Sequence, residues 1–279
     1  MEHRTRINNR LLAALPPADL DLLAPHFRTV PLERDAVLVR SGDEIQRIYF
    51  PLGGVIAFIM DMPNGQTVAT SLVGNEGAAG MLTALGPARS PLTSVVRVAG
   101  TALQISPARF QAALGRSSAL KATVQAFTRA LLLQFQHVAA CNALHSVEAR
   151  LARWLLHVHD RVDGDVLPLT QETLAEFLGV RRTTVTHVVF KLRTSGAIRS
   201  NRRSSIEIDR PRLEAAACEC YQLMRRRIEQ AGLSAAMKPT GHSRLLNHPH
   251  AQTPLFAEAG EVHRRTRTHG GIGQRPRGH

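Results

Sequence analysis

The sequence has little of what a secreted or membrane-spanning protein needs. Its three cysteines, Cys141, Cys218 and Cys220, are too few and too unevenly spaced for a disulfide framework, which favours a reducing compartment. No apolar run approaches the ~20 residues that cross a bilayer. No opening segment combines a basic flank, an apolar core and a small-residue cleavage site. We therefore expect a cytoplasmic protein with no membrane partner.

The composition indicates a globular chain with an anionic partner. At 279 residues the chain is long enough for two domains with separate cores, and 44% of its residues are hydrophobic although only 4% are aromatic. The formal net charge is +13 and the pI is near 11.2. Charge alone does not distinguish a nucleic acid from an acidic membrane surface. The partner therefore has to be inferred from motifs.

The segment from Leu169 to Ile208 has the pattern of a helix-turn-helix followed by a wing. Two short amphipathic helices, the first opening at Thr170, are joined at Gly179, and Gly196 suits the left-handed position that ends the second. Alternating isoleucines around residues 201–204 then predict a winged hairpin. The apolar residues expected to face inward are Leu174, Ala175, Leu178, Val185, Val188, Val189 and Leu192.

The second helix presents a polar and basic face that no acid interrupts. The residues of this face are Arg181, Arg182, Thr183, Thr184, Thr186, His187 and Lys191. Their side chains can donate to phosphates and base edges. The order of parts and the string LAEFLGVRRTTVTHVVFKL resemble the DNA-binding domain of the Crp/Fnr family of bacterial transcription regulators. A structural helix pair with a solvated basic face is the alternative, against which the wing argues.

The resemblance implies a role for each of these side chains. The family positions that read bases in the major groove correspond to Arg182, Thr183, Thr186 and His187. Arg182 suits bidentate contact with a guanine. Thr183 stands where many relatives carry an acid and His187 where they carry an arginine, so the relatives' operator sequences do not transfer. Arg181 stands where relatives often have a serine cap, which leaves the helix N-cap unassigned. Phosphate contacts are expected from Lys191, Arg199, Arg202 and Arg203.

The region from Val30 to Ile105 predicts a β-rich domain. Its apolar runs have a period of two and are broken about every eight to twelve residues by Gly, Pro, Asn or Asp, which favours short strands in a barrel or jelly roll. A short helical lead-in precedes it. The region also resembles the sensory β-roll of the family, which has the cyclic-nucleotide-binding fold. It contains no histidine, so a histidine-based metal centre of the cupin kind is excluded there.

The segment from Ser118 to about Ala143 contains no glycine or proline and predicts one long helix. Apolar residues recur along it at spacings of three and four, at Val124, Phe127, Leu131, Phe135 and Val138. Such a stripe has no obvious place to be buried within one chain. The family dimerises through this helix, so we expect a homodimer. A helix packed on its own barrel is the alternative.

The expected effector site departs from the family pattern. Relatives that bind cyclic AMP place a Gly-Glu pair near the ribose and an Arg-Ser or Arg-Thr pair near the phosphate. Here Gly80 matches the glycine, but Met81 takes the place of the acid, and its thioether is a poor acceptor for the ribose hydroxyls. Arg89 and Ser90 match the phosphate pair at a longer spacing, and Glu76 matches the acid only if the loop is stretched. We therefore expect an altered or vestigial pocket and no cyclic AMP.

Other chemistries find no support in the sequence. There is no nucleophile with its base and no G-x-x-x-x-G-K phosphate loop, so we expect no enzyme. The family's iron–sulfur sensors use cysteines near the N-terminus, and this chain has none before Cys141; no haem ligand set is evident either. Cys218 and Cys220 fall on a predicted helix, where residues two apart do not share a face, so we interpret them as ordinary thiols and expect no metal or cofactor.

The sequence thus predicts an α+β protein whose domains are an N-terminal β-roll (1–117), a dimerisation helix (118–145), a winged helix-turn-helix (146–231) and a disordered basic tail (232–279). The expected function is sequence-specific DNA binding to a pseudo-palindromic operator as a homodimer, under an unidentified signal at the β-roll. RNA polymerase is a further candidate partner. The alternative is a non-specific DNA-binding protein, or a regulatory or scaffold protein with a vestigial sensor.

Overall fold

The structure is a computed structural model that describes residues 7–86, 88–201 and 205–230. The predicted tail, residues 232–279, lies outside these described residues, as do Arg202 and Arg203 of the predicted wing.

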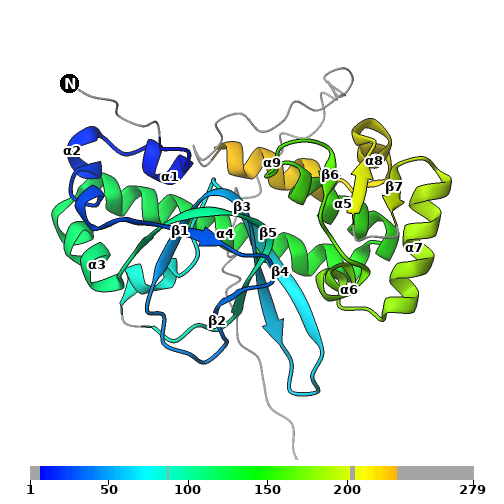
Figure 1. The fold of residues 1–279 in the computed structure, drawn as a ribbon, viewed down its shortest axis with the longest axis horizontal. Helices are drawn as coiled ribbons and strands as arrows, with labels where there is room; N and C mark the ends of the chain where they lie inside the picture. Colours follow the sequence, from blue (N-terminus) through cyan, green and yellow to red (C-terminus); the bar gives the residue numbers. More distant parts are fainter. Residues whose placement is uncertain (1–6, 87, 202–204, 231–279) are drawn as a thin grey trace, which may run out of the picture. The chain divides into compact units, whose positions relative to one another are not determined.

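The first half of the chain forms a five-stranded antiparallel sheet (Figure 1). Its strands are β1 (Arg28–Leu32), β2 (Val37–Val39), β3 (Ile48–Asp61), β4 (Thr67–Val73) and β5 (Thr93–Ile105). They are ordered β1-β5-β3-β4, and β2 also pairs with β5. The predicted β-roll class is confirmed.

The prediction that all strands are short is wrong for β3 and β5. Gly53 and Gly54, two of the glycines that interrupt the apolar runs, lie inside β3, where the pairing with β5 shifts register three times. A Cβ on Gly100 would lie 2.2 Å from the Gly53 carbonyl oxygen, and one on Gly54, whose φ is +86°, would lie 2.6 Å from the Val98 oxygen. Glycine therefore marks the close approach of two long bent strands, rather than their ends.

Short helices precede the sheet, connect β4 to β5 and follow β5. They are α1 (Arg10–Ala13), α2 (Pro17–Leu20), the 3₁₀ turns η1 (Ala24–His26) and η2 (Met81–Leu85), and α3 (Pro107–Arg116). Ser106 caps α3 by accepting from the Arg109 N–H. Side chains of α1 and α3 close the core inside the sheet, where Leu11, Phe50 and Phe110 are at most 1% exposed.

Helix α4 (Ser118–Leu144) is the predicted long helix, and Ser117 caps it by accepting from the Leu120 N–H at 2.9 Å. The expectation that its apolar stripe has no place within one chain is wrong. Val124 and Phe127 are buried in the core of the β-roll, and Leu131 packs against the same core. Within the described residues no helix has the length and apolar character for crossing a membrane.

The second half of the chain is the winged helix-turn-helix. Its elements are α5 (Val147–His159), β6 (Val166–Leu167), α6 (Gln171–Leu178), α7 (Arg182–Thr194), β7 (Ile198–Asn201) and β8 (Ser205–Ile208). The two predicted wing strands pair antiparallel, and β6 adds a third strand that the sequence analysis did not anticipate, in the order β6-β8-β7.

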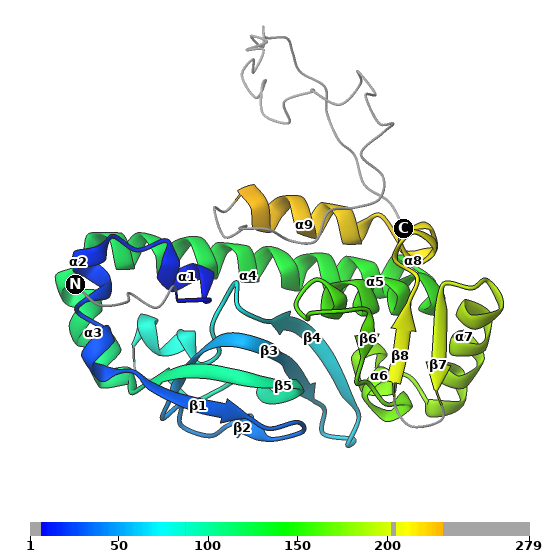
Figure 2. The ribbon, with the colours of Figure 1, turned by 45° about the horizontal axis from the view of Figure 1, so that its top comes forward.

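The helix predicted to hold Cys218 and Cys220 is replaced by two helices, α8 (Arg210–Ala216) and α9 (Cys220–Gln230). Ala217 leaves the helical conformation, with φ −79° and ψ 152°, so the chain turns before α9 begins. Cys218 therefore lies in a turn, and the premise that it shares a helix with Cys220 is wrong. Helix α9 runs alongside α4 (Figure 2).

Candidate nucleic-acid interface

Local capping and a glycine turn set the geometry of the helix-turn-helix. Thr170 Oγ1 accepts from the Thr173 N–H at 3.1 Å and caps α6, as the sequence predicts. Gly179 ends α6 in the left-handed conformation, with φ +64°. The ring centroids of Trp154 and Phe177 lie 5.3 Å apart and hold α6 against α5. These contacts fix the direction in which α7 leaves the turn.

Helix α7 divides into a buried and an exposed face as predicted. Val185, Val188, Val189 and Leu192 are at most 5% exposed and join the core of the domain. On the outer face, at helical spacing, lie the exposed residues Thr183, His187, Phe190 and Thr194. Arg182 and Thr186 flank this line on one side and Lys191 on the other, all exposed, while Thr184 is half-buried. The predicted base-reading residues thus share one accessible surface.

The N-terminus of α7 has no side-chain cap. Arg181 occupies the N-cap in an extended conformation, with no hydrogen bond from its side chain to the helix. The first N–H groups of α7 are therefore left for another acceptor, and a phosphate oxygen is a suitable one.

Acidic residues border the basic face, although none lies within it. Arg182 Nη1 lies 3.6 Å from Glu172 of α6, and Lys191 Nζ lies 3.6 Å from Glu148 of α5. Arg199 on β7 is 3.6 Å from Glu207 on β8. All these side chains are at least 37% exposed, so the pairs are weak and can exchange for phosphate.

Two features of the surface were missed by sequence reasoning. Phe190 is 64% exposed on the outer face of α7, between polar neighbours. The helical spacing could have placed Phe190 on this face, since position 190 follows Thr183 by two helical turns and Thr186 by one. Thr186 Oγ1 donates to Gln171 Oε1 at 3.1 Å, so the start of α6 joins the same surface. No local pattern shows that pairing.

Of the predicted effector residues Gly80, Met81, Arg89 and Ser90, only Met81 lines one of the three cavities described below. Gly80 precedes η2 with φ +85°, and a Cβ there would lie 2.5 Å from the Arg47 carbonyl oxygen. Met81 is 7% exposed and packs with apolar side chains of α1, α3 and α4. One gap lies among these side chains and a second lies between β4 and α4. Each has a volume of only about 10 Å³. A space of that size holds no more than one water molecule.

Arg89 and Ser90 are engaged by neighbouring backbone. Arg89 is exposed and donates to the Gly42 carbonyl oxygen at 2.9 Å, while Ser90 is buried and its hydroxyl donates to the Leu92 oxygen at 2.5 Å. Glu76, the stretched match to the ribose acid, is 7% exposed and binds Arg161. Met81 and Ser90 are both buried, but Met81 packs among apolar side chains, whereas Arg89 and Ser90 donate hydrogen bonds to nearby backbone carbonyl oxygens.

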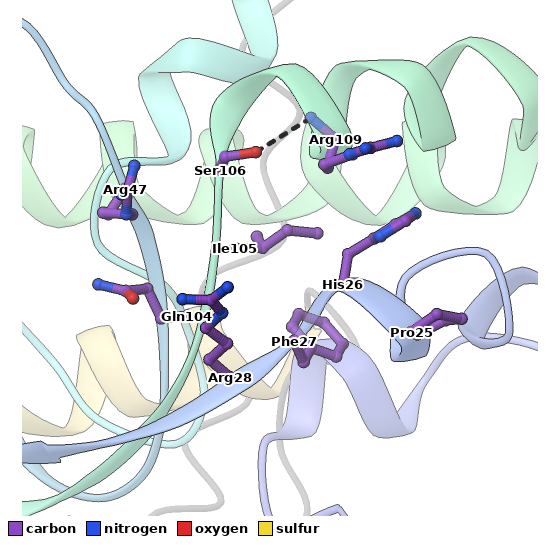
Figure 3. A pocket seen from close by; sticks show the side chains of 9 residues that line it. All are labelled: Pro25, His26, Phe27, Arg28, Arg47, Gln104, Ile105, Ser106 and Arg109. Atoms are coloured by element: carbon purple, nitrogen blue, oxygen red, sulfur yellow. Dashed lines mark hydrogen bonds between the residues drawn. The ribbon is translucent and has the colours of Figure 1, made fainter.

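A hollow of about 380 Å³ lies elsewhere on the β-roll (Figure 3). Its basic side chains come from separate elements, with Arg28 on β1, Arg109 on α3, and Arg47 and His26 in adjoining segments. All four are exposed. The hollow therefore suits an anion at the surface but lacks the buried polar groups that fix a specific ligand.

Both halves of this architecture match family models. Residues 29–117 match the cyclic nucleotide-binding domain, and residues 149–216 match the Crp-like helix-turn-helix domain. The chain belongs to the Crp/Fnr family of transcription regulators. This family consists of regulators rather than enzymes. No curated protein sequence matches the chain.

Several solved structures share the fold at low sequence identity. FixK2 from Bradyrhizobium japonicum is 15% identical with a TM-score of 0.60, over 69% of this chain and 98% of that one. The c-di-GMP responsive global regulator CLP from Xanthomonas campestris is 17% identical with a TM-score of 0.57, over 69% and 99%. A putative Crp/Fnr regulator from Eubacterium rectale is 13% identical with a TM-score of 0.58, over 76% and 95%.

Proposed function

We propose that this Crp/Fnr-type regulator binds a pseudo-palindromic operator as a homodimer, with α7 of each subunit in the major groove. The observation that supports this most strongly is the outer face of α7, where exposed hydroxyl, guanidinium and imidazole groups lie together. The helix itself contains no acidic residue. Base edges in the major groove present donors and acceptors for these groups. Cytoplasmic location, and RNA polymerase as a further partner, are expectations that accompany this proposal.

The side chains divide into two kinds of contact. We assign base contacts to Arg182, Thr183, Thr186 and His187, with Arg182 directed to a guanine. Phe190 joins this group, because an exposed aromatic side chain can contact the methyl group of thymine. Phosphate contacts are assigned to Arg181, Thr184, Lys191, Arg199, Arg202 and Arg203, which position the protein without reading sequence.

The exposed side of α4 supports the homodimer. Opposite its buried stripe, exposed residues recur at alternating spacings of three and four, at Ala122, Gln125, Arg129, Leu132, Gln136, Ala139 and Ala143. This is the spacing of a helix-pairing seam, in which alanines allow close approach and Leu132, 56% exposed, gains burial. The dimer therefore rests on a different helix face from the one that the apolar periodicity indicated.

The close packing around Met81 supports a sensor that does not take cyclic AMP. Apolar side chains fill the space between the sheet and α4, so a nucleotide would have to displace core residues there. The same packing favours the vestigial sensor of the alternative function, a non-specific DNA-binding or scaffold protein. The two functions differ in whether base sequence affects binding.

Selection of bound sequences from random duplexes tests the proposal. We expect enrichment of a pseudo-palindrome with half-sites ~10–10.5 base pairs apart, centre to centre. Binding without any enriched sequence would support the alternative function.

A further inference from the structure

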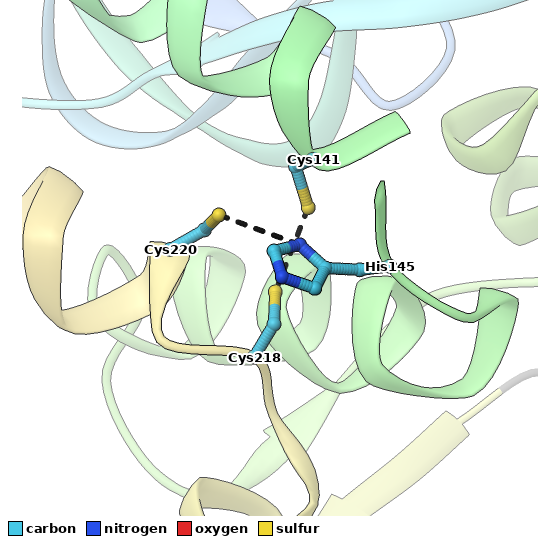
Figure 4. A group of neighbouring side chains, drawn as sticks. All are labelled: Cys141, His145, Cys218 and Cys220. Atoms are coloured by element: carbon cyan, nitrogen blue, oxygen red, sulfur yellow. Dashed lines mark hydrogen bonds between the residues drawn. The ribbon is translucent and has the colours of Figure 1, made fainter. Parts of the chain in front are cut away.

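Four side chains with metal-binding atoms converge beside the end of α4 (Figure 4). They are Cys141, His145, Cys218 and Cys220, and one ligand atom from each lies within 4.8 Å of all the others. The Sγ atoms of Cys141 and Cys218 are 3.5 Å apart, and Cys220 Sγ lies 3.6 Å from His145 Nδ1. The three cysteines are buried and His145 is half-buried.

The backbone explains why these residues meet. Cys141 lies in the last turn of α4 and His145 is its C-cap, four residues later, so both lie at the same end of the helix. Cys218 lies in the turn before α9 and Cys220 begins that helix. Because α9 packs along α4, residues that are 77 positions apart in the sequence come within van der Waals distance.

The separations suit a single tetrahedral ion. Zinc–sulfur bonds of about 2.3 Å and zinc–nitrogen bonds of about 2.0–2.1 Å place neighbouring tetrahedral ligands about 3.5–3.8 Å apart. The separations of 3.5 and 3.6 Å lie within this range, and all four ligand atoms lie within 4.8 Å of one another. A four-iron cluster has its ligands on different irons and holds them farther apart. A Cys141–Cys218 disulfide would leave Cys220 and His145 without a role.

The surroundings of the cluster match those of a zinc–thiolate centre. His145 Nε2 lies 3.0 Å from Glu219 Oε1, so a proton on Nε2 is bound by the carboxylate and Nδ1 is free to coordinate. Arg153 is fully buried, and its Nε and Nη2 have no hydrogen-bond partner among the described residues. Its positive charge acts on all three thiols. Three thiolates and one Zn²⁺ carry a net charge of minus one, which the guanidinium would balance.

We propose that Cys141, His145, Cys218 and Cys220 bind one Zn²⁺ per chain in a closed Cys₃His site. Four protein ligands leave no open position, so the site is structural rather than catalytic. It fastens the junction between α4 and α5 to the start of α9, and so ties the end of the sensor's long helix to the C-terminal helix of the DNA-binding half.

Cobalt substitution of the reduced, full-length protein tests this site. After removal of metal with a chelator, we expect one Co²⁺ per chain to bind with thiolate charge-transfer absorption and tetrahedral d–d bands, and one Zn²⁺ to displace it. Thiol-reactive reagents should modify three cysteines in the metal-free protein and none after zinc is added. Neither readout depends on DNA, so failure here is separate from failure of the proposed regulator.

Variants sharpen the test. Cys220→Ser and His145→Gln should each remove one ligand and abolish or strongly change the cobalt spectrum, whereas His137→Gln, also on α4, should leave it unchanged. Glu219 is 69% exposed, so Glu219→Gln should fold normally while weakening zinc affinity by about 10–100-fold.

Three outcomes would overturn the proposal. Cobalt binding without thiolate absorption would indicate other histidines, several of which lie beyond residue 241. Iron and acid-labile sulfide in the purified protein would indicate an iron–sulfur cluster. Cysteines that react equally fast with and without zinc would mean that the thiols do not bind the metal.

Discussion

Arg161 donates from Nε to Glu76 Oε1 over 2.7 Å, and both side chains are at most 9% exposed. Glu76 lies just after strand β4 and Arg161 just after α5, 85 positions later. The Gly74 N–H also donates to the Glu76 carboxylate. A carboxylate that matches the family's ribose acid only if the loop is stretched thus joins the β-roll to the residue after α5, in the winged helix-turn-helix half.

Removal of one partner of this ion pair should strongly destabilise the protein. Glu76→Gln leaves Arg161 buried without its counter-charge, which costs about 3–5 kcal/mol in the free energy of unfolding. Urea denaturation measures this change. Glu207→Gln, which removes the partner of Arg199 in an exposed pair, should cost less than about 1 kcal/mol. Equal changes in the free energy of unfolding for the two variants would show that the buried pair stabilises the protein no more than the exposed pair does.

Replacement of Leu132 should separate the subunits. Leu132→Glu puts a charge at the centre of the exposed face of α4, so we expect monomers and weaker DNA binding in sedimentation and binding assays. Leu85→Glu is the matched control, because Leu85 is 70% exposed on η2 and outside this face. A monomeric wild type, or a dimeric Leu132→Glu variant, would contradict the homodimer.

His157 should make stability depend on pH. Burial, followed by the charges of Arg153, Arg161 and Arg225, holds the pKa of His157 well below its usual value. The unfolded chain takes up this proton below about pH 6.5 and the folded protein does not, so the stabilisation is present above that pH and is lost as pH falls.

His157→Phe should remove this dependence. Below about pH 6.5 the stability of the wild type should fall relative to the variant by about 1.4 kcal/mol per pH unit. His26→Phe, at an exposed position, should not alter the pH dependence. Parallel stability–pH curves for the wild type and His157→Phe would refute the assignment.

The features that the sequence predicts are those that arise within short stretches of chain. The cap at Thr170, the left-handed Gly179 and the apolar set of α7 all depend on neighbours within a few residues, and the structure confirms each. Phe190 has the right spacing for the DNA-facing surface, but an exposed aromatic side chain looks like a core residue in a sequence pattern.

The features that the sequence does not predict depend on distant contacts. Periodicity identifies the apolar stripe of α4, yet it does not show whether a second copy or the chain's own β-roll covers Phe127. The meeting of Cys141 with Cys218 requires the break after α8 and the packing of α9 on α4. Glycines inside β3 resemble a turn until the crossing with β5 is known.

If α7 reads base sequence, Arg182 on α7 and Arg199 on the wing should contribute differently to DNA binding. Arg182→Ala should cost about 1–3 kcal/mol on the selected operator and relax preference at one base position. Arg199→Ala should weaken binding to operator and random duplexes alike and reduce the salt slope by about 1.

The most direct test of base reading by α7 is to measure binding curves of these two variants. The duplexes should be matched, mutated and random in sequence, and several salt concentrations should be used. We expect only Arg182→Ala to change the ratio of specific to non-specific affinity. If both variants lower affinity uniformly with no change in base preference, α7 is a phosphate anchor and the protein binds DNA without reading its sequence.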